Sequence, residues 1–491
     1  MLKAAKWQID RLGRLVRDEL LKKNLITHML SPTRQDHAWV SAAREALAEA
    51  KFSGVSDFLS MLSSGITRGA TGLSSDIDLS AAAFPFTIDA LNRIADVAGE
   101  TVYVLDGNGS WIDRTTKGFK AAIQKPGRSG YIELAIVDRR DRLKGRVSVN
   151  LWRQVADVLE CTAPKAPIKK ILAGCESRLN PRRVDTVIEP IDVVYTWVNA
   201  DDPAWRDLIA PYRDRIKVDH DRFVQYDELK YSIRSLFTFA PWVRKVYIFT
   251  NCAPPEWFLP SDRIQWVKHE EVIPKAYLPL FNSHAIETFL HEIPGLSERY
   301  IYFNDDVFLS GAVRPTDFFN AYGQSVSRME TSGVLTHLEQ RVEAGTAEEW
   351  QCAAVNSAKL LFKETGVFPL RLHRHAPHAY QRTVYAELAN KFPKELEVTR
   401  RARFRQETDY TFTSFLFHHF ALWRGKAAHL DEDSMVVRAS NYKRFLARKI
   451  YSTQRFFCIN DGGGSADDAD FQRFKKKFLN AHYPFKSPAE I

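Results

Sequence analysis

The sequence predicts an α/β protein in which a Rossmann-like, mostly parallel sheet domain with a helical C-terminal part follows a smaller mixed α/β module. From residue 191 onward, continuous apolar strands alternate with amphipathic helices, which is typical of a parallel sheet covered on both faces. Before it, a basic stretch with several prolines at 161–190 suits a linker. The chain has 491 residues, of which 45% are hydrophobic, so it can form about two or three domains with large cores.

Residues 1–24 predict a basic amphipathic helix, because Leu and Trp recur at helical spacing among Lys and Arg. Such a helix could bind an anionic membrane surface, but charge-rich helices more often pack on their own domain, and we favour the second interpretation. Residues 25–160 predict the mixed α/β module, with a hairpin in 101–112 and further strands in 131–138 and 146–152. No catalytic spacing stands out there, so the role of this module stays open.

The larger domain, 191–491, begins with regularly alternating elements. The apolar run at its start predicts a strand that is buried on both faces. Ser283 is the expected N-cap of the second helix. The predicted order is strand 191–198, helix 226–239, strand 245–250, strand 263–272, helix 283–293 and strand 299–306. Residues 350–491 are predicted to be mainly helical, most clearly in 383–392 and 408–425.

Polar residues follow three of these predicted strands. Asn199 comes after the first strand and Asn251 ends the second. Asn304, Asp305 and Asp306 end the last of them. Because open α/β sheets bind ligands beyond the carboxyl ends of their strands, we expect these groups to converge on one crevice.

Asp305 and Asp306 stand between apolar runs, where unpaired carboxylates are costly. Paired acids at a strand's carboxyl end often hold Mg²⁺ or Mn²⁺ beside a diphosphate, because hard oxygen ligands suit hard cations. Two such carboxylates can also share a proton and act as a base, or simply pair with Arg side chains and backbone amides. At the end of a central strand we favour a functional role, with Mg²⁺ (or Mn²⁺) as the expected cofactor.

A second polar segment, 371–382, carries His373, His375 and His378. Their spacing has some character of a zinc site. The interleaved Arg371 and Arg374 oppose the binding of a dication, so a cationic patch with a titratable histidine better suits phosphate binding and acid–base chemistry. A solvated basic loop is the alternative.

The chain is basic, with a net charge of +9, which favours an anionic partner such as nucleic acid, a membrane surface or a phosphorylated substrate. The Arg-rich segment 400–410 suits bidentate phosphate binding, and no nucleic-acid-binding signature accompanies it, so no nucleic acid is expected. No apolar run is long enough for a membrane span, and no secretory signal is recognised. Five scattered cysteines suggest reduced thiols, and we expect a cytoplasmic protein.

Several blocks in chain order resemble the Stealth family, which comprises bacterial capsular and exopolysaccharide hexose-1-phosphate transferases and the lysosomal-enzyme GlcNAc-1-phosphotransferase. The blocks include "IDVVYTWVNADDPAW", "LPLFNSHAIETFLHEIPGLSERYIYFNDDVFL", "HAPHAYQRTV" with "RFRQETD", and "FFCIND". Together they span about 191–461. Several blocks in the family's order are far more specific than any single motif.

The resemblance implies that a hexose-1-phosphate (GlcNAc-1-phosphate or similar) moves from a UDP-sugar to an acceptor hydroxyl, releasing UMP and forming a phosphodiester. It implies a UDP-hexose donor and a saccharide or polysaccharide acceptor, in capsular or exopolysaccharide synthesis. Such catalysis needs a base near the hydroxyl and cations around the phosphorus. It leaves open a peripheral contact with the cytoplasmic face of the inner membrane or with polysaccharide export machinery, and it leaves the oligomeric state unknown.

The resemblance also assigns candidate residues. His378 is the candidate base, although a role as phosphate ligand stays open, and Arg405 is the candidate clamp for transition-state charge. Asp306 is a candidate catalytic or orienting group and, with Asp305, a candidate metal ligand. The candidate substrate-binding residues are Asp192, Asn199, Asp227, Glu228, Arg234, Asn251, Asn282, His284, Arg382 and Asp409.

The chain departs from the family's pattern after "YTWV". Bacterial members commonly have Asp-Gly or Asp-Ser there, whereas this chain has Asn199-Ala200, which excludes an acid role at that position. Two alternatives to the phosphotransferase remain. One is a metal-dependent glycosyltransferase that releases UDP, and the other is a polyanion-binding protein without catalysis.

Overall fold

The computed structural model describes residues 74–81, 84–107, 109–124, 130–164, 166, 168–175, 187, 189–215 and 227–491. The chain divides into two compact units. The first comprises residues 1–106, 111–140 and 144–181, and the second comprises residues 107–110, 141–143 and 182–491. The helix predicted at 1–24 lies outside the described residues.

The first unit is built on a seven-stranded sheet of order β3-β2-β4-β5-β6-β7, with β1 beside β5. Its antiparallel β2–β3 pair is the predicted hairpin, and two helices bury their apolar faces in its core. β6 and β7 pair within 158–172, so part of the segment predicted as a linker lies in this sheet. The elements are β1 (Ser74–Ser80), α4 (Phe84–Ala98), β2 (Thr101–Leu105), β3 (Trp111–Asp113), α5 (Lys117–Gln124), β4 (Tyr131–Val137), β5 (Leu143–Val155), β6 (Val158–Cys161) and β7 (Lys170–Leu172).

The second unit is built on a five-stranded sheet of order β10-β9-β8-β11-β14. β8 (Ile191–Thr196), β9 (Val246–Thr250), β10 (Ile264–Lys268) and β11 (Arg299–Asn304) are parallel. β14 (His378–Gln381) runs antiparallel to β11 at the edge. The chain adds β9 and β10 on one side of β8 and then β11 on the other, so the strand order reverses between β8 and β11. The predicted α/β class is confirmed.

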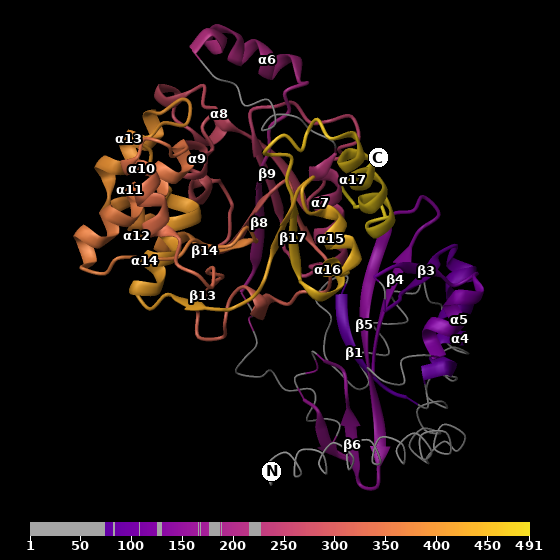
Figure 1. The fold of residues 1–491 in the computed structure, drawn as a ribbon. Helices are drawn as coiled ribbons and strands as arrows, with labels where there is room; N and C mark the ends of the chain where they lie inside the picture. The colour runs from indigo at the N-terminus through magenta and orange to yellow at the C-terminus, as the bar shows by residue number, and fades with distance from the viewer. Residues whose placement is uncertain are drawn as a thin grey trace. The chain divides into compact units, whose positions relative to one another are not determined.

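Helices cover both faces of this sheet. Figure 1 shows the orange helices α10 to α14 on one side of β8 and β9, and α7 with the yellow α15 and α17 on the other. The helices are α6 (Pro203–Ile209), α7 (Glu228–Phe239), α8 (His269–Val272), α9 (Ser283–Glu287), α10 (Leu335–Glu343), α11 (Glu349–Thr365), α12 (Arg382–Lys391), α13 (Pro393–Arg401), the π-helix η7 (Phe412–Leu416), α14 (Phe417–Trp423), α15 (Tyr442–Ala447), α16 (Ile450–Thr453) and α17 (Ala469–His482). The apolar faces of α9 to α14 and the sheet form one large core, in which Phe289, Tyr300 and Phe417 are fully buried.

Short strands complete the second unit. A three-stranded sheet has the order β12-β17-β16, and β13 pairs with β15. These strands are β12 (Val307–Leu309), β13 (Ser325–Ser327), β15 (Ala427–His429), β16 (Met435–Val437) and β17 (Phe456–Ile459). Residues 350–491 therefore hold four strands besides the predicted helices. β12 follows β11 immediately, so β17 lies beside the segment that carries the two aspartates.

Three predicted boundaries are wrong. The strand predicted at 263–272 ends at Lys268, because Glu271 accepts a hydrogen bond from the backbone N–H of Lys268 and starts α8. The helix predicted at 283–293 is the short α9 and a separate 3-10 turn, and its N-cap is Asn282, whose side chain accepts from the N–H of His284. The helix predicted at 408–425 starts at Phe412 as a π-helix.

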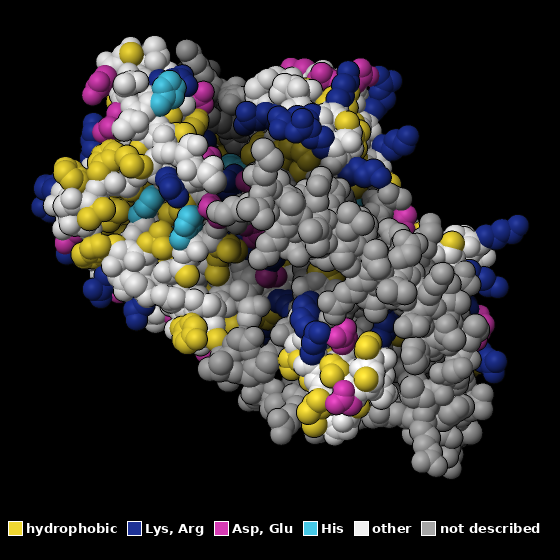
Figure 2. Space-filling view, turned by 60° about the horizontal axis from the view of Figure 1, so that its bottom comes forward, with side chains coloured by type: hydrophobic (Ala, Val, Ile, Leu, Met, Phe, Trp, Pro, Cys, Tyr) yellow, Lys and Arg dark blue, Asp and Glu magenta, His cyan; other side chains and the backbone are white. Residues whose placement is uncertain are grey.

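The helices, the cysteines and the surface charge of the described residues each have a plain character. Among the described residues, no helix is long and apolar enough to cross a membrane. All five cysteines are free thiols. On the face shown in Figure 2, Lys and Arg side chains lie in several separate groups among acidic, apolar and polar ones. Positive charge in the visible, described part of this face is therefore interrupted by other side chains.

Candidate functional site

At the carboxyl ends of β8 and β11, the hydroxyls of Thr196 and Tyr302 form a chain of hydrogen bonds that ends at the carboxylate of Glu287. Thr196 and Asn304, the last residues of the two strands, are register partners. Thr196 Oγ1 lies 2.8 Å from the hydroxyl oxygen of Tyr302 on β11. Tyr302 donates to Oε1 of Glu287, the last residue of α9, at 3.2 Å. This edge, where the strand order reverses, is where open α/β sheets bind ligands.

The loops after β8 and β9 meet at the same edge. Thr250 Oγ1 donates to the carbonyl oxygen of Trp197 at 2.6 Å. The backbone N–H of Asn199 lies 3.2 Å from Sγ of Cys252, which directly follows Asn251. The structure therefore brings together the loops that carry two of the predicted substrate-binding residues.

Asp306 follows β11 and contacts the β17 segment. Its Oδ2 accepts from the thiol of Cys458 and from Nδ2 of Asn460, each at 3.1 Å. Burial, and next the charge of Asp306, raises the pKa of Cys458 well above its usual value, so the thiol keeps its proton and donates.

The other carboxylate oxygen of Asp306 lacks such a partner. Oδ1 is buried and has no hydrogen-bond partner among the described residues. A hard cation would satisfy this oxygen. The unpaired oxygen of Asp306 therefore fits Mg²⁺ or Mn²⁺, provided that the cation takes further oxygen ligands, for example from a bound phosphate, since one carboxylate alone leaves its coordination incomplete.

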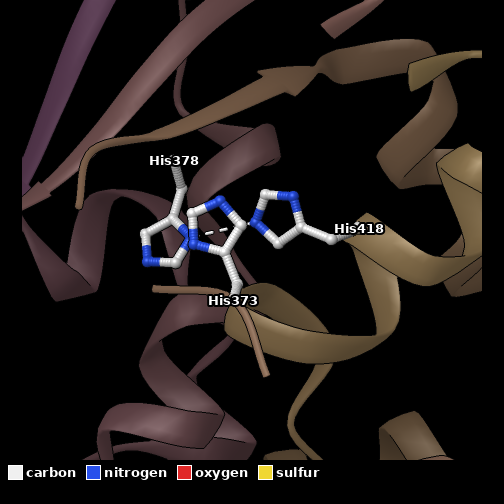
Figure 3. A group of neighbouring side chains, drawn as sticks. All are labelled: His373, His378 and His418. Carbon is white, nitrogen blue, oxygen red and sulfur yellow. Dashed lines mark hydrogen bonds between the residues drawn. The ribbon is translucent and has the colours of Figure 1, made fainter. Parts of the chain in front are cut away.

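Three histidines form a buried cluster (Figure 3), with His378 on β14, His418 on α14 and His373 in the segment before β14. His373, His378 and His418 each offer a ring nitrogen within 4.8 Å of the others. Burial lowers the pKa of all three, and that of His378 falls to about 3, so the rings are neutral at pH 7. The rings of His373 and His418 stack at 3.9 Å with 21° between their planes. Lone pairs of stacked rings run side by side, so this geometry favours hydrogen bonding over a shared metal ion.

Hydrogen bonds order the nitrogens of two of these rings. His378 Nδ1 lies 2.9 Å from His418 Nε2, and His418 Nδ1 lies 3.0 Å from Oγ of Ser327. When His418 Nδ1–H donates to Ser327, its Nε2 accepts the proton on His378 Nδ1. That assignment leaves a lone pair on Nε2 of His378, the nitrogen directed away from His418 (Figure 3).

Arg405 lies against the start of α9. Its Nε and Nη2 donate to Oγ of Ser283 at 3.1 and 2.6 Å. Nearby, Nδ2 of Asn282 donates to Oδ2 of Asp409 at 2.8 Å, and His284 Nδ1 lies 3.3 Å from the same oxygen. Asn282, His284 and Asp409 are buried, so this network anchors the loop that carries Arg405. The structure thus brings together the predicted residues Arg405, Asn282, His284 and Asp409. The last three hold the loop that carries Arg405.

Five predicted substrate-binding residues have structural partners elsewhere in the second unit. Asp192 lies near the amino end of β8, away from the edge that ends at Thr196, and accepts the backbone N–H of Ser297 at 2.7 Å. Glu228 and Arg234 lie on α7, Asp227 directly precedes α7, and Arg382 is the first residue of α12. The partners are Asp192 with Arg244, Asp227 with Lys230, Glu228 with Lys475, Arg234 with Glu490, and Arg382 with the carbonyl oxygen of His291. We leave these five out of the candidate site.

The sequence interpretation did not single out Glu287, Tyr302 or His418. Glu287 lay inside a predicted amphipathic helix and Tyr302 inside a predicted strand, where such residues are ordinary. The one available signal for His418 was a His-His pair in the otherwise apolar run 415–423. None of these residues belongs to a recognisable spacing, because their partners are far away in the chain.

Sequence models of three conserved regions of Stealth proteins match the second unit. Conserved region 1 matches residues 189–217, region 2 matches 222–327 and region 3 matches 374–422. The chain carries the Stealth conserved regions. The resemblance stated from the sequence is thereby confirmed. Stealth region 2 contains Glu287, Tyr302 and the aspartate pair, and Stealth region 3 contains His378 and Arg405.

Curated relatives with similar sequences are named phosphotransferases. The chain is 36% identical over 317 residues to the capsular polysaccharide phosphotransferase SacB of Neisseria meningitidis serogroup A, covering 61% of this chain and 57% of that protein. It is 38% identical over 315 residues to the exopolysaccharide phosphotransferase SCO6023 of Streptomyces coelicolor, covering 61% of this chain and 52% of that protein. The chain therefore matches a little over half the length of these relatives.

Solved structures with a similar arrangement are only distantly related. A galactosyltransferase LgtC with donor and acceptor sugar analogues aligns at a TM-score of 0.30 and 9% identity, over 60% of this chain and 95% of that chain. Mouse xyloside xylosyltransferase 1 aligns at a TM-score of 0.28 and 10% identity, over 56% of this chain and 99% of that chain. At these scores the likeness carries no argument about the site.

Proposed function

We propose that the second unit is a sugar-phosphate transferase of capsular or exopolysaccharide synthesis. It transfers a hexose-1-phosphate from a UDP-hexose to a hydroxyl of a saccharide acceptor, releases UMP and forms a phosphodiester. The observation that carries the proposal is the match of three Stealth regions, in order, to a chain whose named relatives are polysaccharide phosphotransferases. The order of the parallel strands β10-β9-β8-β11 supports a Rossmann-like donor site where that order reverses.

The proposed donor site lies beyond the carboxyl ends of β8 and β11. Asp305 and Asp306 would hold Mg²⁺ or Mn²⁺ when it is bound, and the cation would offset the negative charge of the diphosphate. Arg405 is the proposed clamp for charge on the transferred phosphoryl group, because guanidinium binds phosphate oxygens in a bidentate manner. Asn282, His284 and Asp409 hold the Arg405 loop in place.

His378 is proposed to meet the substrate with Nε2. Its pairing with His418 fixes the ring, and it lies on the edge strand β14 directly opposite Tyr302 of β11. Asn199 and Asn251 are proposed to contact the nucleotide or sugar from the loops after β8 and β9. Peripheral membrane contact, export partners and a cytoplasmic location remain part of the proposal, and no role is assigned to the first unit.

The proposal is tested by measuring nucleotide products. The protein is incubated with Mg²⁺, a panel of UDP-GlcNAc, UDP-glucose and UDP-galactose, and bacterial capsular oligosaccharides as acceptors, while UMP and UDP are both quantified. UMP with a phosphodiester in the product supports phosphotransfer. UDP instead of UMP would show a glycosyltransferase, and binding of oligosaccharide without either nucleotide would show a binding protein.

One variant with a matched control, and the removal of cations, sharpen this test. Arg405→Lys is expected to lower the rate of UMP release about 100-fold, whereas Arg401→Lys, which changes an exposed arginine paired with Glu397, leaves the rate unchanged. Removing cations with a chelator is expected to stop UMP release, and adding Mg²⁺ back restores it. Full activity in chelator would refute the metal assignment.

A further inference from the structure

We propose that Glu287 is the general base that takes the proton from the acceptor hydroxyl. This inference rests on the proposed phosphotransfer and assigns to the carboxylate at the end of α9 the role that the sequence resemblance assigns to His378. Neither residue type nor spacing points to Glu287 in the sequence, so the argument depends on where the fold places it.

The first argument is position. Glu287 ends α9 and is joined through Tyr302 to Thr196, the residue that closes β8. The carboxylate therefore lies at the edge where the strand order reverses. Glu287 as a residue is neither fully buried nor exposed, so it keeps some access for a substrate hydroxyl while the surrounding protein desolvates its carboxyl group. Arg405, the proposed phosphate clamp, is close enough for its charge to affect this carboxyl group.

The second argument is orientation. The pKa of Tyr302 lies well above its usual value, mainly because of burial, so this phenol keeps its proton and donates to Oε1. The side chain of Thr413, on the π-helix, also hydrogen-bonds the Glu287 carboxyl group. Thr413 Oγ1 in turn lies 2.8 Å from the hydroxyl of Tyr385. These contacts hold the carboxylate in one orientation, and π-helical turns often occur at functional sites.

The third argument is proton affinity. Burial raises the pKa of Glu287 to about 7, against the lowering effect of Arg405 and of hydrogen bonds from Tyr302 and Thr413. Glu287 also lies close enough to the phenols of Tyr380 and Tyr385 for its charge to help raise their pKa, and both phenols are protonated at pH 7. A base works best when its pKa is near the working pH, so this carboxylate is suited to accept a proton at neutral pH.

His378 is less suited to that role. Burial, and next the charges of His375 and Arg328, lowers its pKa to about 3. A proton placed on this ring would be unstable by comparison with one on Glu287, and no described carboxylate hydrogen-bonds either nitrogen of His378. A neutral imidazole can still hydrogen-bond a phosphate or sugar oxygen, so His378 is assigned to positioning the substrate.

The proposed step balances as follows. The acceptor oxygen forms a bond to the phosphorus that carries the hexose while its proton moves to the Glu287 carboxylate. The bond between that phosphorus and the bridging diphosphate oxygen breaks, and its electron pair leaves on UMP. Glu287 then releases the proton to solvent, which its pKa of about 7 permits between turnovers.

The experiment compares Glu287→Gln with Glu343→Gln, an exposed glutamate at the end of α10, using the UDP-hexose and acceptor that give most UMP. Glu287→Gln is expected to lower kcat about 100- to 10,000-fold, while donor binding by calorimetry and the far-UV spectrum stay unchanged. The kcat of the wild type should fall below an apparent pKa near 7, and this limb should be absent from Glu287→Gln. Formate should partly restore UMP release by Glu287→Ala.

The outcomes separate the two proposals. If the wild type releases UMP but Glu287→Gln keeps at least a third of its kcat, or if its acid limb persists, Glu287 is not the base and phosphotransfer still stands. If His378→Gln rather than Glu287→Gln abolishes the acid limb, the role returns to His378. If the wild type releases only UDP or no nucleotide, both proposals fail together.

Discussion

The ion pair between Arg234 and Glu490 allows a clear test of whether a predicted substrate-binding residue has a structural role instead. Nε of Arg234 lies 2.9 Å from Oε1 of Glu490, and Nη2 lies 2.6 Å from Oε2. Nη1 also donates to the carbonyl oxygen of Tyr483 at 3.0 Å. The two charged side chains are 9% and 3% exposed, so the pair joins α7 to the C-terminal segment away from water.

Removing one partner should therefore destabilise the second unit strongly. Glu490→Gln leaves the buried guanidinium without its counter-charge, which typically costs about 3–5 kcal/mol. For a protein of this size we use about 2 °C for each kcal/mol, which gives a fall in Tm of about 6–10 °C. The double substitution Arg234→Met with Glu490→Met replaces the pair with apolar side chains and should recover most of that loss.

We measure this effect by differential scanning calorimetry on the wild type, Glu490→Gln, Arg234→Met and the double variant. The same proteins are titrated with UDP-GlcNAc. Lower Tm values for both single variants, with recovery in the double variant, indicate a structural pair. The reasoning is refuted if Arg234→Met keeps the wild-type Tm and binds the nucleotide sugar at least tenfold more weakly. That result would make Arg234 a donor ligand, as the sequence resemblance implies.

Three further predictions concern the candidate site. The pKa of Glu287 rises from 4.5 to about 7 on folding, so the free energy of unfolding should decrease by about 1–3 kcal/mol as pH rises from about 4.5 to 7. Urea unfolding of the wild type at pH 5 and pH 8 should show this decrease. The same decrease in Glu287→Gln would contradict the assignment. Asp306→Asn should raise the Mg²⁺ concentration for half-maximal UMP release about tenfold or more, while Asp470→Asn, on the exposed start of α17, should not. His418→Phe should leave Nδ1 of His378 without its partner at 2.9 Å and cost about 1–3 kcal/mol of stability, measured by urea unfolding, whereas the same change at the exposed His337 should be neutral.

Local sequence patterns predicted the strands and loops whose formation depends on residues close to one another in the chain. The apolar runs that became β8, β9 and β11 are long enough and sufficiently apolar to identify buried parallel strands. The aspartates after β11 and the loop after β8 then follow from the chain order alone. The helix predicted at 283–293 was wrong at its end, because α9 stops at Glu287, and its N-cap is Asn282 and not Ser283, a choice that an Asn-Ser pair in the sequence leaves ambiguous.

Partners that are distant in the chain could not be predicted in the same way. Glu228 and Arg234 are charged residues on an otherwise apolar helix, a pattern that suits a ligand site as well as a buried ion pair. Only the fold shows that Lys475 and Glu490 neutralise them. Conversely, Glu287 is inconspicuous in the sequence, and its role emerges only when β11 and the π-helix enclose it.

The edge strand β14 has a consequence for the order of folding. It pairs with β11 in a register that sets His378 directly opposite Tyr302, yet residues 305–377 lie between the two strands. β14 is the last strand of this sheet in the chain and pairs only with β11, so it adds to a sheet that must already contain β11. We therefore expect the edge strand to dock late during refolding. Recovery of activity should lag behind recovery of secondary structure, because the nascent sheet lacks the histidine cluster until that last pairing forms.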